Sequence, residues 1–445
     1  MSGQEILGLC MLVAMISIIF VGFPIAFTLL FIALFFGAVG LGAELTFNLA
    51  YLQIWGTMKD DILPAVPLFI FMGFMTEQAG LMERLFLAMR NVLAPLRGSL
   101  YLSVILTATI FAMATGIVGA AVTVLGIMAG PVMVRSGYDA KLSAGAIAAG
   151  GTLGILIPPS VMLVVMGPTI GVPVNLLYAS AFGPGLLLAA MYIIYCLVRS
   201  HLKPELGPPV PLAERVTDKV ELAREFLIGV VPLTLLIGFT LGTILAGLAT
   251  PTEAASCGAV GATLLAAAYG KLSKKALKSA AMSAMITSSM VLFLAVASTV
   301  FGAVFTKLGA TDLIANAISQ VPLPDMGKLL LIMALIFVLG WPFEWPAVIL
   351  VFLPIFVPVV AKLNLGLEPQ ELMIWFGALV AINLQTAFLS PPVAMSAYYL
   401  KNVMPQWSLS TIYRGMGNFM IIQVLCLLAV LLWPEIALWL PRAVQ

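Results

Sequence analysis

Two proline pairs, each inside a long apolar stretch, limit what this chain can fold into. The first lies in Gly150–Met166, where Pro158 and Pro159 remove two backbone donors and clash with the preceding helical turn. The stretch is apolar enough for a bilayer but cannot form one uninterrupted helix. We therefore predict two half-helices with unwound backbone between them, the second capped by the hydroxyl of Ser160.

A second copy of this pattern lies in Asn383–Leu400, where Pro391 and Pro392 interrupt another apolar stretch. Ser390 is expected at the N-cap of the new helix and Pro391 at its first position. One proline pair fits an ordinary kinked helix equally well. Two broken helices at matching places in two halves of a chain are typical of secondary transporters, whose unwound backbone lines ion and substrate sites.

The composition places the chain in a membrane. Of its 445 residues, 62% are hydrophobic and only 9% are charged, whereas a soluble domain carries roughly 25% charged residues. The fold class is therefore an all-α polytopic membrane protein, and a net charge of +2 gives no indication of nucleic-acid binding. No nucleophile–base or metal-ligand set supports a membrane-embedded enzyme. The isolated thiols and the single imidazole lack metal or redox spacing; they are Cys10, Cys196, Cys257, Cys426 and His201.

The two halves of the chain show the same order of segments. A Gly-x6-Gly pattern at Gly73 recurs at Gly302, an offset of 229, and the proline pairs are offset by 233. Each half is predicted to contain about five spanning helices, a re-entrant hairpin and a broken helix, and an odd number of crossings inverts the second copy. The predicted units are a first repeat at 1–198 (hairpin 99–134, broken helix 141–169), a linker at 199–224, and a second repeat at 225–445 (hairpin 328–361, broken helix 371–400).

The positive charges predict the orientation. With the N-terminus outside, sixteen of the 21 lysines and arginines fall in cytoplasmic loops, including those of the 199–224 linker. This bias agrees with the positive-inside rule. At one loop, Thr250-Pro251-Thr252-Glu253 has the pattern of a capping box, so Glu253 is expected to serve the start of a helix.

Several stretches resemble the large membrane subunit of TRAP (tripartite ATP-independent periplasmic) transporters, the DctM-like proteins. The stretches are PLFIFMGFMTEQAG (67–80), ATGIVGAAV (114–122), GTLGILIPPS (151–160), TPTEAASCGAVGATLLAAAYGKLS (250–273), GWPFEWPAVILVFLPIFVPV (340–359) and INLQTAFLSPPVAM (382–395). The resemblance implies sodium-driven uptake of an organic acid across the bacterial inner membrane by an elevator-type movement. It also implies two partners, a small four-helix membrane subunit and a periplasmic substrate-binding protein. A stand-alone ion-coupled anion transporter of related architecture is the alternative.

The candidate binding residues lie at the hairpin tips and the helix breaks. The central motifs contain no lysine or arginine, so an organic anion must be balanced by backbone N–H groups, helix N-termini and co-transported sodium. No other cofactor is expected. The candidates for substrate or ion binding are Thr115, Gly116, Gly119, Thr152, Gly154, Pro158, Ser160, Gly340, Glu344, Asn383, Gln385, Thr386, Ser390 and Pro391, with sodium placed at Thr115, Gly116, Thr152, Thr386 and Ser390.

Alternative roles remain open for these side chains. Serine and threonine hydroxyls in spanning helices commonly bond to their own backbone. Glu344 is expected either to bind the cation or a proton, since intramembrane carboxylates are functional candidates, or to cap a half-helix. Trp341 and Trp345 are interpreted as packing or interface anchors.

Overall fold

A computed structural model describes residues 2–211, 215–216, 218–391 and 394–444, apart from the side chains of residues 112, 114 and 115. These described residues form helices and connecting turns, with no strand. The all-helical class predicted from the composition is therefore confirmed.

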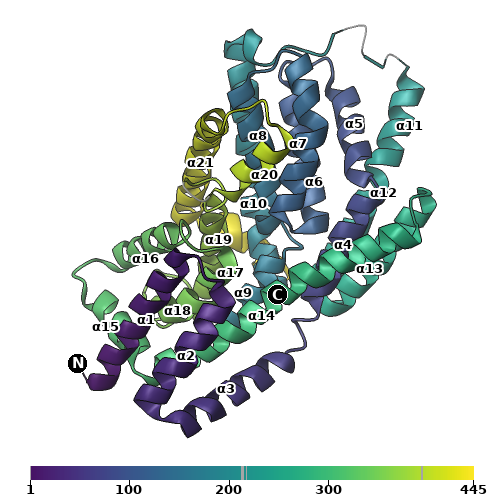
Figure 1. The fold of residues 1–445 in the computed structure, drawn as a ribbon. Coiled ribbons are helices and arrows are strands. Elements are labelled where there is room, and N and C mark those ends of the chain that lie inside the picture. The colour runs from purple at the N-terminus through teal and green to yellow at the C-terminus, as the bar shows by residue number, and fades with distance from the viewer. Residues whose placement is uncertain (1, 212–214, 217, 392–393, 445) are drawn as a thin grey trace.

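The helices form two groups that pack mainly within themselves (Figure 1). In the first group, α14 packs on α2, α3 and α4, and α4 packs on α13. Its members are α1 (Gly3–Val21), α2 (Ile25–Leu41), α3 (Ala43–Met58), α4 (Ala65–Gln78), α5 (Leu81–Leu93), α11 (Lys219–Gly229), α12 (Val231–Leu245), α13 (Pro251–Ala268), α14 (Lys274–Lys307) and α15 (Ala310–Gln320).

The second group is built around α8, which packs on α6, α7 and α21. Its helices from the first half are α6 (Ser99–Thr115), α7 (Val118–Arg135), α8 (Ala140–Leu156), α9 (Val161–Ile170), α10 (Val174–Leu202) and the short η1 (Pro204–Leu206). Those from the second half are α16 (Asp325–Leu339), α17 (Trp345–Ala347), the π-helical η3 (Val348–Phe352), α18 (Leu353–Val360), α19 (Pro369–Thr386), α20 (Met395–Val403), α21 (Leu409–Leu432) and α22 (Glu435–Val444).

Several helices are long and apolar enough to cross a membrane. Among the described residues, six helical stretches qualify, one of them made of α11 and α12 together, and up to eight spans result if each bent pair counts as one. The bent pairs are α4 with α5, at 61°, and α8 with α9, at 44°. These spans confirm a polytopic membrane protein, whereas the inverted relation of the two halves stays a prediction.

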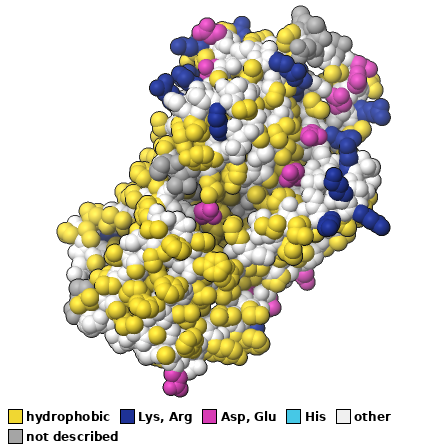
Figure 2. Space-filling view, viewed as in Figure 1, with side chains coloured by type: hydrophobic (Ala, Val, Ile, Leu, Met, Phe, Trp, Pro, Cys, Tyr) yellow, Lys and Arg dark blue, Asp and Glu magenta, His cyan; other side chains and the backbone are white. Residues whose placement is uncertain are grey.

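Basic side chains gather toward one end of the molecule. Figure 2 shows lysines and arginines over the upper and right-hand parts of this face, and hydrophobic side chains over the lower left. Helix α14 begins at Lys274 and ends at Lys307, about 50 Å away along the helix axis. The predicted orientation places the Lys274 end of α14 in the cytoplasm.

Both segments predicted as hairpins turn back on themselves. Helices α6 and α7 are joined by Gly116 and Ile117, and the Ser99 hydroxyl at one far end lies 3.3 Å from the Tyr138 hydroxyl near the other. Likewise, the backbone N–H of Asn364, after α18, donates to Asp325 Oδ2 at the start of α16, at 2.9 Å. Their return to the same membrane face stays a prediction.

Local sequence signals predict some helix boundaries better than others. The capping box at Thr250 is present: its hydroxyl accepts from the Glu253 N–H, and the Glu253 carboxylate accepts from the Thr250 N–H. The polar linker is shorter than predicted, because α10 continues to Leu202 and α11 begins at Lys219.

Glycines allow α8 and α21 to pack closely. A Cβ on Gly415 of α21 would lie 2.0 Å from the carbonyl oxygen of Lys141, whereas a Cβ on Gly417 would meet no atom within 4 Å. We expect Gly415→Ala to destabilise the protein by about 2 kcal/mol, a typical cost of overpacking, and Gly417→Ala to be neutral or mildly stabilising. Thermal unfolding in detergent measures both, and equal midpoints for the two variants would contradict the close packing.

Candidate functional site

The first helix break follows from the chemistry of proline. In a continuous helix, the carbonyls of Gly154 and Ile155 would accept from residues 158 and 159, but Pro158 and Pro159 have no N–H to donate. The Ser160 hydroxyl donates to the Ile155 carbonyl instead. Ser160 is the N-cap residue of α9, yet it makes no side-chain capping bond, so the predicted cap is wrong. Its hydroxyl satisfies one of the two carbonyls that the prolines leave without a partner.

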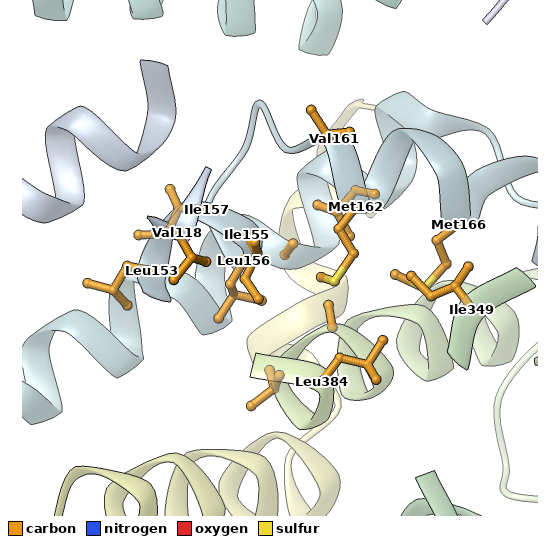
Figure 3. Close-up of a cluster of buried hydrophobic side chains, with 14 of the residues drawn as sticks. Val118, Leu153, Ile155, Leu156, Ile157, Val161, Met162, Met166, Ile349 and Leu384 are labelled. Carbon is orange, nitrogen blue, oxygen red and sulfur yellow. The ribbon is translucent and has the colours of Figure 1, made fainter. Parts of the chain in front are cut away.

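The tip between α6 and α7 lies against this break. Gly116 has a left-handed backbone with φ of 60°, a conformation that favours glycine. A Cβ on it would lie 3.5 Å from the Val161 nitrogen, at the start of α9, and 3.8 Å from the Gly154 carbonyl oxygen. In Figure 3, Val118 from this tip lies beside Leu153 and Ile157. The first tip and the first break therefore bring together the N-terminus of α9 and the Gly154 carbonyl, which has no helical partner.

The second helix break is longer than predicted. Helix α19 ends at Thr386, turns continue through Ser390, and α20 begins only at Met395. The predicted helix start at Ser390 and Pro391 is therefore wrong. Ser390 contributes both its backbone N–H and its hydroxyl to the Thr386 carbonyl, at 2.9 and 2.8 Å, which prolongs the turns of α19 instead of starting a helix. Pro392 lies outside the described residues.

The two broken helices meet at one hydrogen bond. Gln385 Nε2 donates to the Thr152 hydroxyl oxygen at 3.0 Å, and both side chains are fully buried. The two residues are 233 positions apart, the same offset that separates Pro158 from Pro391. Corresponding positions of the two halves therefore touch each other in the core of the second helix group.

Two side chains near the end of α19 have buried amide oxygens without a hydrogen-bond partner. Asn383 Nδ2 donates to the Met333 carbonyl at 2.7 Å, but Asn383 Oδ1 and Gln385 Oε1 are buried without a hydrogen-bond partner. The hydroxyls of Thr152 and Thr386 donate to the carbonyls of Ala149 and Asn383, at 2.8 and 2.6 Å, so each oxygen can act further only as an acceptor, and the oxygen of Thr152 already accepts from Gln385. Buried oxygens left without a donor are candidate ligands for a cation.

A cleft of about 300 Å³ joins both tips and both breaks. It is lined by Gly116 and Gly119 from the first tip and by Glu344 from the second. Among the described residues that line it, Glu344 is the one charged side chain. The other lining residues are Ile70, Ile117, Val118, Ile155, Val161, Thr287, Met290, Val291, Trp345, Pro346, Phe388, Met395 and Tyr399.

One expectation about the second tip changes with the structure. Glu344 is the N-cap residue of the short α17 but makes no side-chain capping bond there, and it faces the cleft. Trp345 packs against the core, as the sequence suggested, and also lines the cleft. Tyr399 was not identified from the sequence, although a Cβ on Gly119 would lie 2.9 Å from its ring. Only the tertiary structure reveals this pairing, because the two residues are distant in sequence.

The remaining candidates lie around the cleft rather than on its wall. A Cβ on Gly340 would lie 3.2 Å from Ala387 Cβ, which places the second tip beside the second break. Ser160 and Ser390 are buried at the breaks, whereas Pro391 is exposed. The side chain of Thr115 lies outside the described residues.

Comparison with known proteins identifies the family of this chain. The family described as tripartite ATP-independent periplasmic transporter, DctM component, matches residues 12–436. The C4-dicarboxylate TRAP transporter large permease protein DctM of Pseudomonas aeruginosa is 29% identical over 394 residues, which is 88% of each chain. The sialic acid TRAP transporter large permease protein SiaM of Vibrio cholerae is 28% identical over 436 residues, 96% of each chain.

A likeness to a solved structure extends to the fold alone. The Alcanivorax borkumensis YdaH transporter superposes with a TM-score of 0.61 at 15% identity, over 88% of this chain and 89% of that one.

The sequence relatives are transporter permeases, which confirms a transport protein rather than an enzyme, and the apolar spans agree with a multi-pass protein of the bacterial inner membrane. The chain therefore belongs to the DctM component family and is the large membrane subunit of a tripartite ATP-independent periplasmic transporter.

Proposed function

We propose that this subunit imports a small organic acid anion together with sodium ions. The observation that carries the proposal is the meeting of the two helix breaks at Thr152 and Gln385, next to buried amide oxygens that lack donors. Sodium takes oxygen ligands, and carbonyls freed where helices unwind are typical of coupling-ion sites in secondary transporters.

The charge of the cleft supports coupling to a cation. An organic anion entering it meets the Glu344 carboxylate and no lysine or arginine among the described lining residues. Such an anion needs positive charge from elsewhere. The open N-terminus of α9 supplies a partial one, since Ser160 leaves it uncapped. Bound sodium ions supply the remainder and drive accumulation of the substrate.

The symmetry of the contacts supports the predicted repeats. The second helix group takes α6–α10 from the first half and α16–α22 from the second, and each tip lies beside the break of its own half. We infer that residues 1–198 and 225–445 are inverted repeats and that this second group carries the substrate, moving against the first group in an elevator-type motion.

The family suggests which partners complete the transporter. The relatives are named as permeases of carboxylates and sialic acid, which supports a carboxylate as substrate. We propose that a periplasmic binding protein delivers it and that a small four-helix subunit accompanies this chain in the membrane.

The test is reconstitution in proteoliposomes. We expect no uptake by this chain alone, and uptake when the small subunit, the loaded binding protein and an inward sodium gradient are all present. Omitting each component in turn is the control. Robust transport by the single chain would instead support the stand-alone anion transporter. Uptake that ignores the sodium gradient would contradict sodium coupling.

A further inference from the structure

The wall of the cleft comes from both helix groups. Ile70 of α4 and Thr287, Met290 and Val291 of α14 belong to the first group, and the other lining residues belong to the second group or to the turns between its helices. Helix α14 also packs on α17 and η3, across the boundary between the groups (Figure 1). A solute in the cleft therefore contacts both the group proposed to move and the group against which it moves.

Hydrogen-bond donors are scarce on this wall. Among the described lining residues, the side chains that can donate a hydrogen bond are those of Thr287, Trp345 and Tyr399. The ionised carboxylate of Glu344 can only accept. An organic anion in the cleft is therefore held by these three side chains, by backbone N–H groups or by bound cations.

The protein itself makes little use of the three donors, which are all half-buried. Within the described part of the chain, the Tyr399 hydroxyl makes one hydrogen bond, to Met395 Sδ at 3.9 Å, and a thioether sulfur is a weak acceptor. The Thr287 hydroxyl and Trp345 Nε1 have no hydrogen-bond partner among the same residues. Thr263 of α13, by contrast, donates to a carbonyl of its own helix at 2.8 Å. Donors left without a protein partner are available to water or to a ligand.

The position of Tyr399 is fixed by the first tip. A Cβ on Gly119 would lie 2.9, 3.1 and 3.3 Å from three carbons of the Tyr399 ring, so the ring packs directly on the backbone of the tip. Two turns further along α7, Gly126 meets Leu400 and Val403 of α20 in the same way. The phenol ring is therefore held by packing while its hydroxyl keeps only a weak partner, an arrangement suited to recognition of a solute.

The start of α9 complements these donors. Val161, the first residue of α9, lines the cleft, and Ser160 leaves this N-terminus without a side-chain cap. Hydrogen bonds to a carboxylate are charge-assisted and roughly twice as strong as neutral ones. Because the hydroxyls, the indole N–H and the helix N-terminus add no full positive charge, the need for a co-transported cation remains.

We propose that Tyr399 and Thr287 recognise the carboxylate group of the substrate by donating hydrogen bonds from the two helix groups, with Trp345 Nε1 as a third donor. The proposal rests on the proposed function for the identity of the substrate and for the movement of the second group. Tyr399 and Trp345 belong to the second group and travel with the substrate. Thr287 belongs to the first group, so its contact is broken when the second group moves.

Affinity labelling tests the two hydroxyls without knowledge of the natural substrate. In a variant whose four cysteines are replaced, a reporter cysteine is placed on either wall, as Ile117→Cys at the first tip or Met290→Cys on α14. Each reporter is treated with iodoacetate, whose carboxylate stands in for that of the substrate, or with iodoacetamide, its neutral isostere. We expect Tyr399→Phe and Thr287→Val each to lower the iodoacetate rate about tenfold, as for the loss of one charge-assisted hydrogen bond, and to leave the iodoacetamide rate largely unchanged.

Matched substitutions outside the cleft wall are the controls. Tyr398→Phe removes a phenol hydroxyl from the residue next to Tyr399, and Thr263→Val removes a threonine hydroxyl from α13; neither residue lines the cleft. Both should leave the two rates unchanged, and thermal unfolding in detergent confirms that every variant is folded. A folded variant of Tyr399 or Thr287 that keeps its iodoacetate rate at both reporters would remove that hydroxyl from the recognition site. Equal losses for both reagents would overturn recognition of the carboxylate.

The side from which the reporter is labelled tests the moving and the fixed contact. In vesicles of known orientation, iodoacetate reaches Ile117→Cys from one side at a time. We expect Tyr399→Phe to slow labelling from both sides and Thr287→Val from one side only, because the first group contacts the substrate in one conformation. Equal losses from both sides for Thr287→Val would overturn this distinction. A reporter that reacts from only one side in the parent protein would instead argue against the elevator-type movement, while labelling in detergent still decides the role of the two hydroxyls.

Discussion

Replacing Gln385 with leucine is expected to raise the sodium concentration for half-maximal uptake about tenfold. Gln385 Oε1 is buried without a hydrogen-bond partner, and its Nε2 donates to Thr152, so the side chain joins the two broken helices and offers an oxygen to a cation. Losing one ligand worth about 1.4 kcal/mol corresponds to a tenfold change in affinity for one ion. Leucine has a similar size and removes the amide without opening a large cavity.

The matched control is Gln423→Leu. Gln423 of α21 is also fully buried, and its side-chain neighbour Tyr192 lies on α10 rather than at either break. Its replacement should leave the sodium midpoint unchanged. Uptake is measured against sodium concentration at fixed substrate in the reconstituted system. Equal midpoints for Gln385→Leu and the unaltered protein would remove Gln385 from the sodium site.

The threonine hydroxyls at the breaks allow a second test of the sodium site. Thr152→Ala and Thr386→Ala are expected to raise the sodium midpoint if their oxygens bind the ion. If the hydroxyls only donate to the carbonyls of Ala149 and Asn383, removing a hydroxyl costs little free energy, since side-chain hydrogen bonds in membrane proteins contribute about 0.6 kcal/mol on average. The midpoint would then stay in place while expression or maximal rate changed. Ser319→Ala, on exposed α15, is the control for both.

Glu344→Gln is expected to lower the uptake rate by about 10- to 100-fold. Glu344 faces the cleft and makes no side-chain capping bond to α17, so its charge is available to a bound ion. Charge-assisted contacts contribute about 1.5–3 kcal/mol, and glutamine retains the size of the side chain while removing the charge. Glu253→Gln is the matched control, because glutamine preserves a capping box.

The sodium dependence and the pH dependence of uptake by Glu344→Gln would together identify the bound cation. A raised sodium midpoint at constant pH would assign a sodium ion to the carboxylate. A pH profile of uptake that becomes flat, with an unchanged sodium midpoint, would assign a proton. Full uptake with both profiles unchanged would contradict any role of Glu344 in coupling.

The sequence determines features that depend on covalent chemistry and local composition. Proline lacks an N–H wherever it lies, so Pro158 and Pro391 predict interrupted helices without knowledge of their neighbours. The Thr250–Glu253 capping box likewise forms within four residues. The spans follow from the length and apolarity of the stretches, since a bilayer imposes the same requirement on every segment.

Other features depend on neighbours that are distant in the sequence. Helix α3 was not identified, because polar residues such as Gln53 and Thr57 interrupt its apolar pattern; it packs on α2 and α14. The Ser160 hydroxyl bonds backward to the Ile155 carbonyl instead of capping α9. The unpaired carbonyl is the stronger attraction in a buried environment, where an unsatisfied acceptor is costly.

Identifying the candidate site requires both the local sequence signals and the tertiary contacts. The proline pairs identify which stretches unwind, and the tips predict where chemistry lies, so Gly116, Gly119 and Glu344 were found from the sequence and line one cleft. Only the tertiary structure brings Thr152 to Gln385 and Tyr399 to Gly119. Pattern and propensity act over a few residues, whereas the partner of a buried polar group is decided by which helices pack together, and that is a property of the whole chain.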